Sequence, residues 1–276
     1  MSRYTCITDL DHPGLEVFTQ LREPQLYHYY EPSPGLFIAE TPNVIRRCVA
    51  AGYEPVCMLA EESLADEACD ILSSRPDTPV YVCPLESMKK ITGFALTHGM
   101  LCSMRRKELP AAEALLGEIE SAAPEHAARI AVLEGVVNPT NVGAIFRSAA
   151  ALGISAVLLT NDCADPLQRR CARVSMGTVF QIPWTFVSDD WNRLLHTHGY
   201  RTAAMALESD SVPVSDERLK HEKKLAIVLG SEGYGLKKET IRQSDYTVLI
   251  PMAHGVDSLN VAAAAAVAFW EIVKFV

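Results

Sequence analysis

The sequence has no apolar run long enough to span a membrane, no low-complexity segment and no internal repeat. The nearest case, Val261 to Trp270, is about half the length of a membrane span. The first residues, MSRYTCITDLDHPG, lack the basic-then-apolar form of a secretory signal peptide. These absences argue against membrane-spanning, repeat and secreted proteins, and we expect a cytoplasmic one.

Metal-ligand spacings are also missing. The eight cysteines form no C-x-x-C pair, and the eight histidines show no H-E-x-x-H or similar pattern. Several cysteines lie inside apolar runs, so we expect reduced thiols that pack as small core side chains. We expect neither a structural nor a catalytic metal.

An excess of positive charge is absent too. The 276 residues carry a formal net charge of -9, which argues against a protein that coats nucleic acid indiscriminately. A specific RNA enzyme is still allowed, because a local basic patch can bind RNA. The candidate clusters are Arg46-Arg47, Lys89-Lys90 and Arg105-Arg106-Lys107. Each cluster taken separately fits a solvated helix face or loop end better.

Strand and helix patterns divide the chain into parts. Residues 1–30 are polar and aromatic and form an N-terminal extension, with Tyr27, Tyr29 and Tyr30 close together. Short strands alternate with helices over residues 31–107, which predicts a small α/β/α domain. An Ala/Glu-rich linker helix is expected over residues 108–127. From residue 128 to 276, continuous apolar strands predict a mainly parallel sheet with helices on both faces.

Three strand ends in this last domain carry polar and glycine residues. They are Asn138 to Arg147, Gly230 to Leu236, and Ile250 to Asn260. Ligands bind at the carboxyl ends of strands in open α/β sheets, so the three ends predict one shared pocket. The glycine spacing matches neither G-x-G-x-x-G nor a phosphate-binding loop, and no G-x-S-x-G is present. The glycines would let the main chain come close to a ligand, so the pocket suits a flat, largely neutral one.

The third strand end leads into a long alanine-rich helix. Ser258 is a good N-cap residue and alanine has the highest helix propensity, so the helix is expected to open at Ser258-Leu259-Asn260. Small side chains would let this helix pack closely against its neighbours.

The segments NVGAIFRSA, GSEGYGL and IPMAHGVDSLNVAAAAAVAFWE resemble the three motifs of the SpoU/TrmH branch of the SPOUT RNA ribose 2'-O-methyltransferases. All three occur in the family's order, each at a strand end. Residues 31–107 resemble, more weakly, the L30e-like substrate-binding domain that often precedes such a catalytic domain. The resemblance covers about half of the chain, from about Arg129 to the C-terminus.

The resemblance implies a C-terminal trefoil knot, a homodimer formed through the catalytic domain, and S-adenosylmethionine as cofactor. It implies a cofactor site formed by Leu229, Gly230, Gly235, Ile250, Met252, Ser258 and Leu259. The catalytic set it implies is Asn141, Arg147, Glu232, Ser258 and Asn260. In this set Arg147 would clamp the target phosphate and ribose, and Glu232 would orient Arg147 or Asn141. The general base stays open, as does a purely structural role for each residue taken singly, such as helix capping.

The RNA partner would be ribosomal or transfer RNA. Candidate RNA contacts are Arg46, Arg47, Lys89, Arg105, Arg106, Arg147 and Arg173. Arg173 and Ser175 lie where relatives carry an R-x-S-x-G-like stretch, which fits RNA contact and dimer packing equally well. Two alternatives remain: a SPOUT enzyme that methylates a base nitrogen, and a non-catalytic RNA-binding or ribosome-assembly protein.

Overall fold

A computed structural model describes residues 3–8, 11–30, 34–92, 99–122 and 127–273 of the chain. It divides into two compact units. Unit 1 comprises Met1–Glu108 and Leu167–Phe180, and unit 2 comprises Leu109–Pro166 and Gln181–Val276. The expected start of the α/β/α domain at residues 31–33 and the expected end of the linker helix at residues 123–126 lie outside the described residues.

Unit 2 contains a seven-stranded sheet in which every strand pair is parallel, in the order β10-β12-β9-β11-β6-β7-β8. The strands are β6 (Ala128–Leu133), β7 (Ala156–Thr160), β8 (Trp184–Val187), β9 (Arg201–Met205), β10 (Val212–Pro213), β11 (Lys224–Leu229) and β12 (Tyr246–Leu249). The helices are α6 (Ala112–Ala122), α7 (Pro139–Ala151), α9 (Trp191–Thr197), α10 (Glu217–His221), α11 (Lys238–Gln243) and α12 (Val261–Ile272). This confirms the expected parallel α/β domain.

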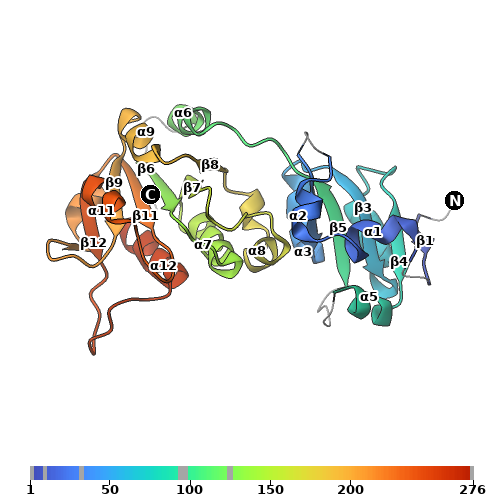
Figure 1. Cartoon of the computed structure of the whole chain (residues 1–276). Coiled ribbons are helices and arrows are strands. Elements are labelled where there is room, and N and C mark those ends of the chain that lie inside the picture. The colour runs from blue at the N-terminus through green and yellow to red at the C-terminus, as the bar shows by residue number, and fades with distance from the viewer. Residues whose placement is uncertain (1–2, 9–10, 31–33, 93–98, 123–126, 274–276) are drawn as a thin grey trace. The chain divides into compact units, whose positions relative to one another are not determined.

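Both faces of this sheet are buried, which explains why its strands read as continuous apolar runs. One face packs against α6 and α9, and Ile130, Val132, Leu116 and Trp191 belong to that core. The alternate residues of β6, including Ala131, point to the other face and are also fully buried. There α7 and α12 lie side by side (Figure 1).

The last helix begins two residues later than expected. Asn260, not Ser258, is the N-cap of α12, and its side chain accepts a hydrogen bond from the amide of Ala262 at 3.0 Å. All ten residues from Pro251 to Asn260 are exposed, and the segment leaves β12 as a long loop (Figure 1). The trefoil knot implied by the resemblance stays a prediction. Within the described residues, no helix is long and apolar enough to cross a membrane.

Unit 1 contains a five-stranded mixed sheet in the order β1-β4-β3-β5-β2, with β5 antiparallel to both of its neighbours. The strands are β1 (Thr5–Cys6), β2 (Leu36–Glu40), β3 (Pro55–Glu61), β4 (Val80–Cys83) and β5 (Met100–Arg105). The helices are η1 (Pro13–Leu15), α1 (Glu16–Thr19), α2 (Glu23–Tyr27), α3 (Pro42–Ala50), η2 (Glu62–Leu64), α4 (Ala65–Ile71), α5 (Leu85–Thr92), α8 (Arg169–Val174) and η3 (Thr178–Phe180).

Residues 1–30 are part of unit 1 rather than an extension of it. Their strand β1 pairs with β4, and their buried side chains Ile7, Leu15, Phe18 and Leu26 share one hydrophobic core with β2 and β3. The segment thus supplies one edge strand and part of one covering layer of the sheet. The sequence pattern did not predict this role, because β1, with two residues, and α1, with four, are too short to show a hydrophobic period.

Residues 167–180 depart from the expected domain of residues 128–276, because they fold into unit 1. Glu40, at the end of β2, is buried with 3% of its side chain exposed and accepts from Arg169 Nε at 2.7 Å and Arg173 Nη1 at 3.0 Å. The ring of Phe180 packs against that of Phe37 at 5.8 Å between centroids. We call residues 167–180 the returning segment.

The cysteines confirm the prediction of core thiols. Six are buried, Cys6 is exposed and Cys163 is half-buried, and all eight are free. Burial raises the pKa of Cys57 to about 12, so this thiol stays neutral.

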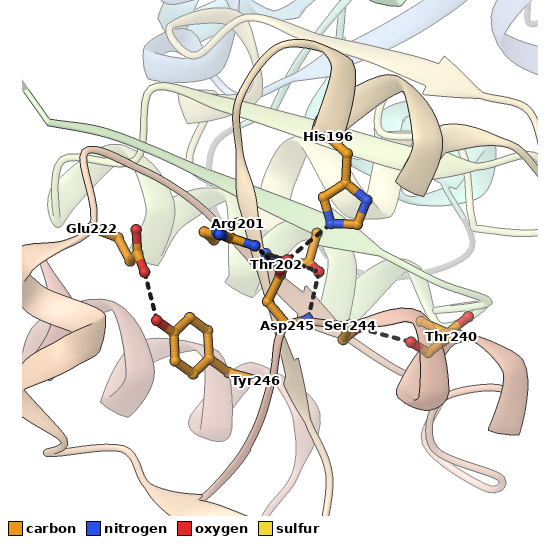
Figure 2. Close-up of polar contacts among 8 residues, drawn as sticks. All are labelled: His196, Arg201, Thr202, Glu222, Thr240, Ser244, Asp245 and Tyr246. Carbon is orange, nitrogen blue, oxygen red and sulfur yellow. Dashed lines mark hydrogen bonds and ion pairs between the residues drawn. The ribbon is translucent and has the colours of Figure 1, made fainter.

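A polar cluster closes the amino-terminal edge of the unit 2 sheet (Figure 2). Asp245, just before β12, accepts hydrogen bonds from Thr202 N at 2.9 Å and His196 Nε2 at 2.9 Å, and it pairs with Arg201. Burial raises the pKa of Asp245, but the hydrogen bonds from Thr202, His196 and Arg201 outweigh this and lower it to about 2.

We therefore expect Asp245 to stabilise unit 2 at neutral pH and to lose this effect in acid. The folded-state pKa lies below the ordinary value of 3.8, so the stabilisation is present above about pH 4 and is lost as pH falls toward 2. Its size at pH 7 is about 2 kcal/mol. Urea unfolding of Asp245→Asn at pH 7 and pH 3 measures it, with the exposed Asp189→Asn as control. If the free energy of unfolding fell as much between pH 7 and pH 3 in Asp245→Asn as in the wild type, this role would be contradicted.

Candidate active site

The carboxyl ends of β6 and β11 lie next to each other in the centre of the unit 2 sheet. Leu133 pairs with Leu229 in the parallel register, so both strands end at the same level. The chain leaves β6 toward β7 on one side, whereas β11 and β9 lie on the other. Such a reversal of strand order opens a crevice at the strand ends, where ligands of open α/β sheets bind.

The loop after β6 runs directly into α7. Asn138 is the N-cap of this helix, and its side chain accepts from the amide of Thr140 at 2.9 Å. Capping is therefore the role of Asn138 and not of Asn141. Asn141 lies in the first turn and is only 8% exposed. A buried primary amide needs partners for its polar atoms, and two other loops provide them.

Asn141 connects all three predicted strand ends. Its Nδ2 donates to Glu232 Oε1 at 2.8 Å, and its Oδ1 accepts from Asn260 Nδ2 at 3.1 Å. We call this chain of hydrogen bonds, from Asn260 to Asn141 to Glu232, the relay. The cap of α12 fixes its direction, because Asn260 Oδ1 already accepts from the amide of Ala262. The amino group of Asn260 must then face Asn141, and the amino group of Asn141 must face Glu232.

The loop that carries Glu232 is a tight turn closed on itself. Ser231 and Gly235 exchange backbone hydrogen bonds at 3.0 and 3.1 Å. A Cβ at Gly230 would lie 2.3 Å from the backbone of Gly235, and Gly235 has a φ of +67°. Both glycines are thus required by the loop itself, whatever else they contact.

A buried carboxylate, that of Glu134, supports the exposed loop of Glu232, and sequence reasoning missed it. Glu134 follows β6, is 3% exposed and accepts from the amide of Lys237 at 2.7 Å and from Thr240 Oγ1 at 2.5 Å. It therefore fixes the start of α11 just after the Glu232 loop. The signal that would have found it is its position directly after a buried strand.

The structure does not bring Arg147 and Ser258 into the relay. Both are exposed, and among the described residues neither makes a hydrogen bond or ion pair through its side chain. Arg147 is six residues after Asn141, which places it about 120° around α7 from that side chain. Its guanidinium is thus available to a ligand from outside.

The predicted cofactor residues come from the end of β11 and from the loops that follow β11 and β12, and they differ in exposure. Leu229 and Gly230 are buried, and Ile250 is half-buried. Met252 and Leu259 are 36% and 41% exposed. Apolar side chains held open at strand ends suit a ligand with a planar, neutral part.

Most of the predicted RNA-binding cations have partners inside unit 1. These contacts are Arg46 with Glu67, Arg47 with the carbonyl of Met176, Lys89 with Glu86, Arg105 with Glu54, Arg106 with the carbonyl of Leu36, and Arg173 with Glu40. Ser175 is fully buried and bonded to the carbonyl of Ala172. RNA contact by these cations stays a prediction.

Comparison with known proteins agrees with this arrangement. A model of the SpoU rRNA Methylase family matches residues 128–270. An uncharacterized tRNA/rRNA methyltransferase of Mycobacterium bovis is 36% identical over 96% of this chain and 90% of its own length. The 23S rRNA (guanosine-2'-O-)-methyltransferase RlmB of Acinetobacter baylyi is 28% identical over 67% of this chain and 74% of its own.

Solved structures show the same fold. The AdoMet-bound rRNA methyltransferase of Sinorhizobium meliloti superposes with a TM-score of 0.80 and 22% identity, over 98% of each chain. The family match covers the β6, β11 and β12 strand ends from which Asn141, Glu232 and Asn260 meet. This chain belongs to the SpoU rRNA methylase family of RNA methyltransferases.

Proposed function

We propose that this protein transfers the methyl group of S-adenosylmethionine to a ribose 2'-hydroxyl of ribosomal or transfer RNA. The observation that carries the proposal is the Asn260–Asn141–Glu232 relay, which joins three loops at the switch point of the sheet. Relatives named as 23S rRNA guanosine 2'-O-methyltransferases support ribosomal RNA as the substrate.

The residues present fit the cofactor. Leu229 and Gly230 would hold it at the end of β11, and Ile250, Met252 and Leu259 would hold it at the end of β12. Strand β9 lies between β11 and β12, so these two ends are roughly 10 Å apart. When bound, S-adenosylmethionine supplies a methyl group already activated by a sulfonium. The protein therefore has to orient and polarise the acceptor hydroxyl, with no need to activate the donor further.

The relay suits that task. Glu232 Oε1 is taken by Asn141, whereas Oε2 makes no hydrogen bond within the described part of the chain. Oε2 can accept a hydrogen bond from the ribose hydroxyl and so raise the electron density on its oxygen. Arg147, exposed on α7, would bind the adjoining phosphate through its planar guanidinium. Ser258 would position the ribose from the loop before α12.

We also propose a homodimer formed through unit 2. Helix α12 presents an apolar stripe to solvent at Ala263, Val267 and Trp270, three positions on one helical face. Val267 is 39% and Trp270 66% exposed in the single chain. A surface of this kind is typical of an association site.

The substitution Trp270→Glu is expected to convert the dimer to a monomer, because it places a charge in the apolar stripe. Sedimentation velocity at micromolar concentration measures the change, and Val267→Ala provides a milder disturbance of the same stripe. A wild-type protein that sediments as a monomer, or an unchanged dimer in Trp270→Glu, would contradict this interface.

The function is tested in two steps. Calorimetric titration with S-adenosylmethionine should give about one site per subunit. Transfer of labelled methyl to ribosomal and transfer RNA from a strain lacking the gene should follow, and mass spectrometry of the digested RNA should find a 2'-O-methylated nucleoside. A methylated base would favour the base-nitrogen alternative. A protein that binds RNA but neither binds S-adenosylmethionine nor transfers its methyl group would favour the non-catalytic alternative.

A further inference from the structure

A tyrosine stands at the tip of the loop that carries Glu232, and the relay does not use it. Tyr234 is 97% exposed, so both faces of its ring are open to solvent. Among the described residues, its side chain makes no hydrogen bond and no contact with another ring or a cation. The ring therefore contributes nothing to the packing of unit 2.

The backbone of the loop holds this ring in one place. The hydroxyl of Ser231 accepts from the amide of Tyr234 at 3.3 Å and donates to the carbonyl of Gly235 at 3.2 Å. These bonds add to the backbone pair that Ser231 makes with Gly235. A tyrosine side chain has only two torsions, so a flat ligand that packs on it loses little conformational entropy.

The same turn brings the ring close to the carboxylate of the relay. Tyr234 is two residues after Glu232, so their Cα atoms are at most about 7 Å apart. Glu232 is held by Asn141 at 2.8 Å. A Cβ at Gly233, between the two side chains, would meet nothing within 4 Å. The turn thus leaves room for one ligand that contacts both Glu232 and Tyr234.

Exposed apolar side chains gather at this edge of the sheet. Of the nine large ones that the structure describes in unit 2, six lie on the loops that follow β6, β9, β11 and β12, which are adjacent strands. They are Val137, Leu207, Tyr234, Met252, Val256 and Leu259. Single exposed apolar residues are common on any surface, whereas such a gathering marks a ligand-binding surface. Tyr234 is the aromatic member of these six.

We propose that Tyr234 stacks on the base of the target nucleotide and so positions its ribose against Glu232. The inference rests on the proposed function, which identifies the ligand as RNA. The 2'-hydroxyl is on C2' of the ribose and the base is on the adjoining C1'. A ribose held at Glu232 therefore brings its own base beside the ring of Tyr234, and two flat faces can stack without any added charge.

This contact has a consequence for the choice of substrate. A base inside a duplex is covered on both faces, so the target nucleotide would be unpaired or turned out of its helix. Stacking tolerates every base, because each has a flat face. Tyr234 would thus select an accessible nucleotide rather than a particular base, whose identity would have to be read by other groups.

The first test measures single-turnover methyl transfer to ribosomal RNA from a strain lacking the gene, at subsaturating RNA. Tyr234→Ala should be slower by about tenfold or more, because the base loses its stacking partner, whereas Tyr234→Phe should stay within about twofold of the wild type. Tyr234→Leu keeps an apolar side chain without a flat ring and should resemble the alanine variant. Leu109→Ala, which truncates an exposed side chain of unit 2 outside these loops, is the matched control. Calorimetric binding of S-adenosylmethionine checks that each variant is folded.

The second test asks whether the ring contacts the target base itself. A synthetic RNA that covers the methylated position is made with hydrogen in place of the target base, and its 2'-hydroxyl is kept. The wild type should lose about tenfold on this RNA. Tyr234→Ala should lose nothing further on it, since the contact is already gone. Removing the base of a neighbouring nucleotide should leave the effect of Tyr234→Ala unchanged.

The outcomes separate this role from a structural one. A merely structural effect of Tyr234→Ala would slow transfer to the intact and the base-free RNA by the same factor. That result, or transfer at the wild-type rate by Tyr234→Ala, would overturn the stacking contact. Failure of the proposed function appears differently, as absent transfer by the wild-type protein to every RNA, and the inference would fall with it.

Discussion

Replacing Asn260 by aspartate should reduce methyl transfer by about 10²-fold or more while leaving unit 2 folded. A carboxylate oxygen can still accept from the amide of Ala262, so the cap of α12 is kept. The relay is broken, because aspartate has no amino group to offer to Asn141 Oδ1. Two carboxylates would then flank Asn141, and Glu232 would lose its fixed orientation.

Single-turnover transfer to RNA and thermal unfolding of the same preparations measure the two effects. Asn260→Ala loses the cap and the relay together, and it should be both inactive and less stable by about 1 kcal/mol. The comparison isolates the relay from the cap. If Asn260→Asp transfers methyl at the wild-type rate, the relay plays no part in catalysis.

The largest stability effect is expected for Glu40→Ala in unit 1. Glu40 is buried between the guanidinium groups of Arg169 and Arg173, and its removal leaves both without this carboxylate. Breaking a buried ion pair from one side costs about 3 kcal/mol or more. The loss should appear as a lower midpoint of urea unfolding and as easier proteolysis of the returning segment.

Glu67→Ala is the matched control for this change. It also removes a carboxylate from an arginine, Arg46, at a distance of 2.8 Å, but both side chains are more than a third exposed. Such a pair contributes less than about 1 kcal/mol. Equal destabilisation by the two substitutions would mean that burial of Glu40 contributes nothing.

The sequence predicted the meeting of the three strand ends better than the limits of the units. Strand ends of one parallel sheet must meet at one edge, so polar residues after β6, β11 and β12 could be grouped without coordinates. The choice of partner could not be made in this way. Glu232 was expected to orient Arg147 or Asn141, and only the geometry shows that its partner is Asn141.

The limits of the units depend on packing between distant segments. The pattern of residues 167–180 is that of a short helix and a turn. Nothing in the local sequence indicates which of the two sheets the segment packs against. Residues 1–30 were unpredictable for a different reason, since a two-residue strand and a one-turn helix are shorter than any hydrophobic period. In both cases long-range burial, at Glu40 and at Leu15, decides the structure.

The returning segment has a consequence for the order in which the chain can fold during synthesis. The chain leaves unit 1 after Glu108, re-enters it at Leu167 and leaves again after Phe180. When Glu108 emerges from the ribosome, unit 1 still lacks Arg169 and Arg173, the partners of Glu40. Its completion must wait until β6, α7 and β7 of unit 2 have been made. The amino-terminal unit is therefore not finished first, and the two units mature together rather than one after the other.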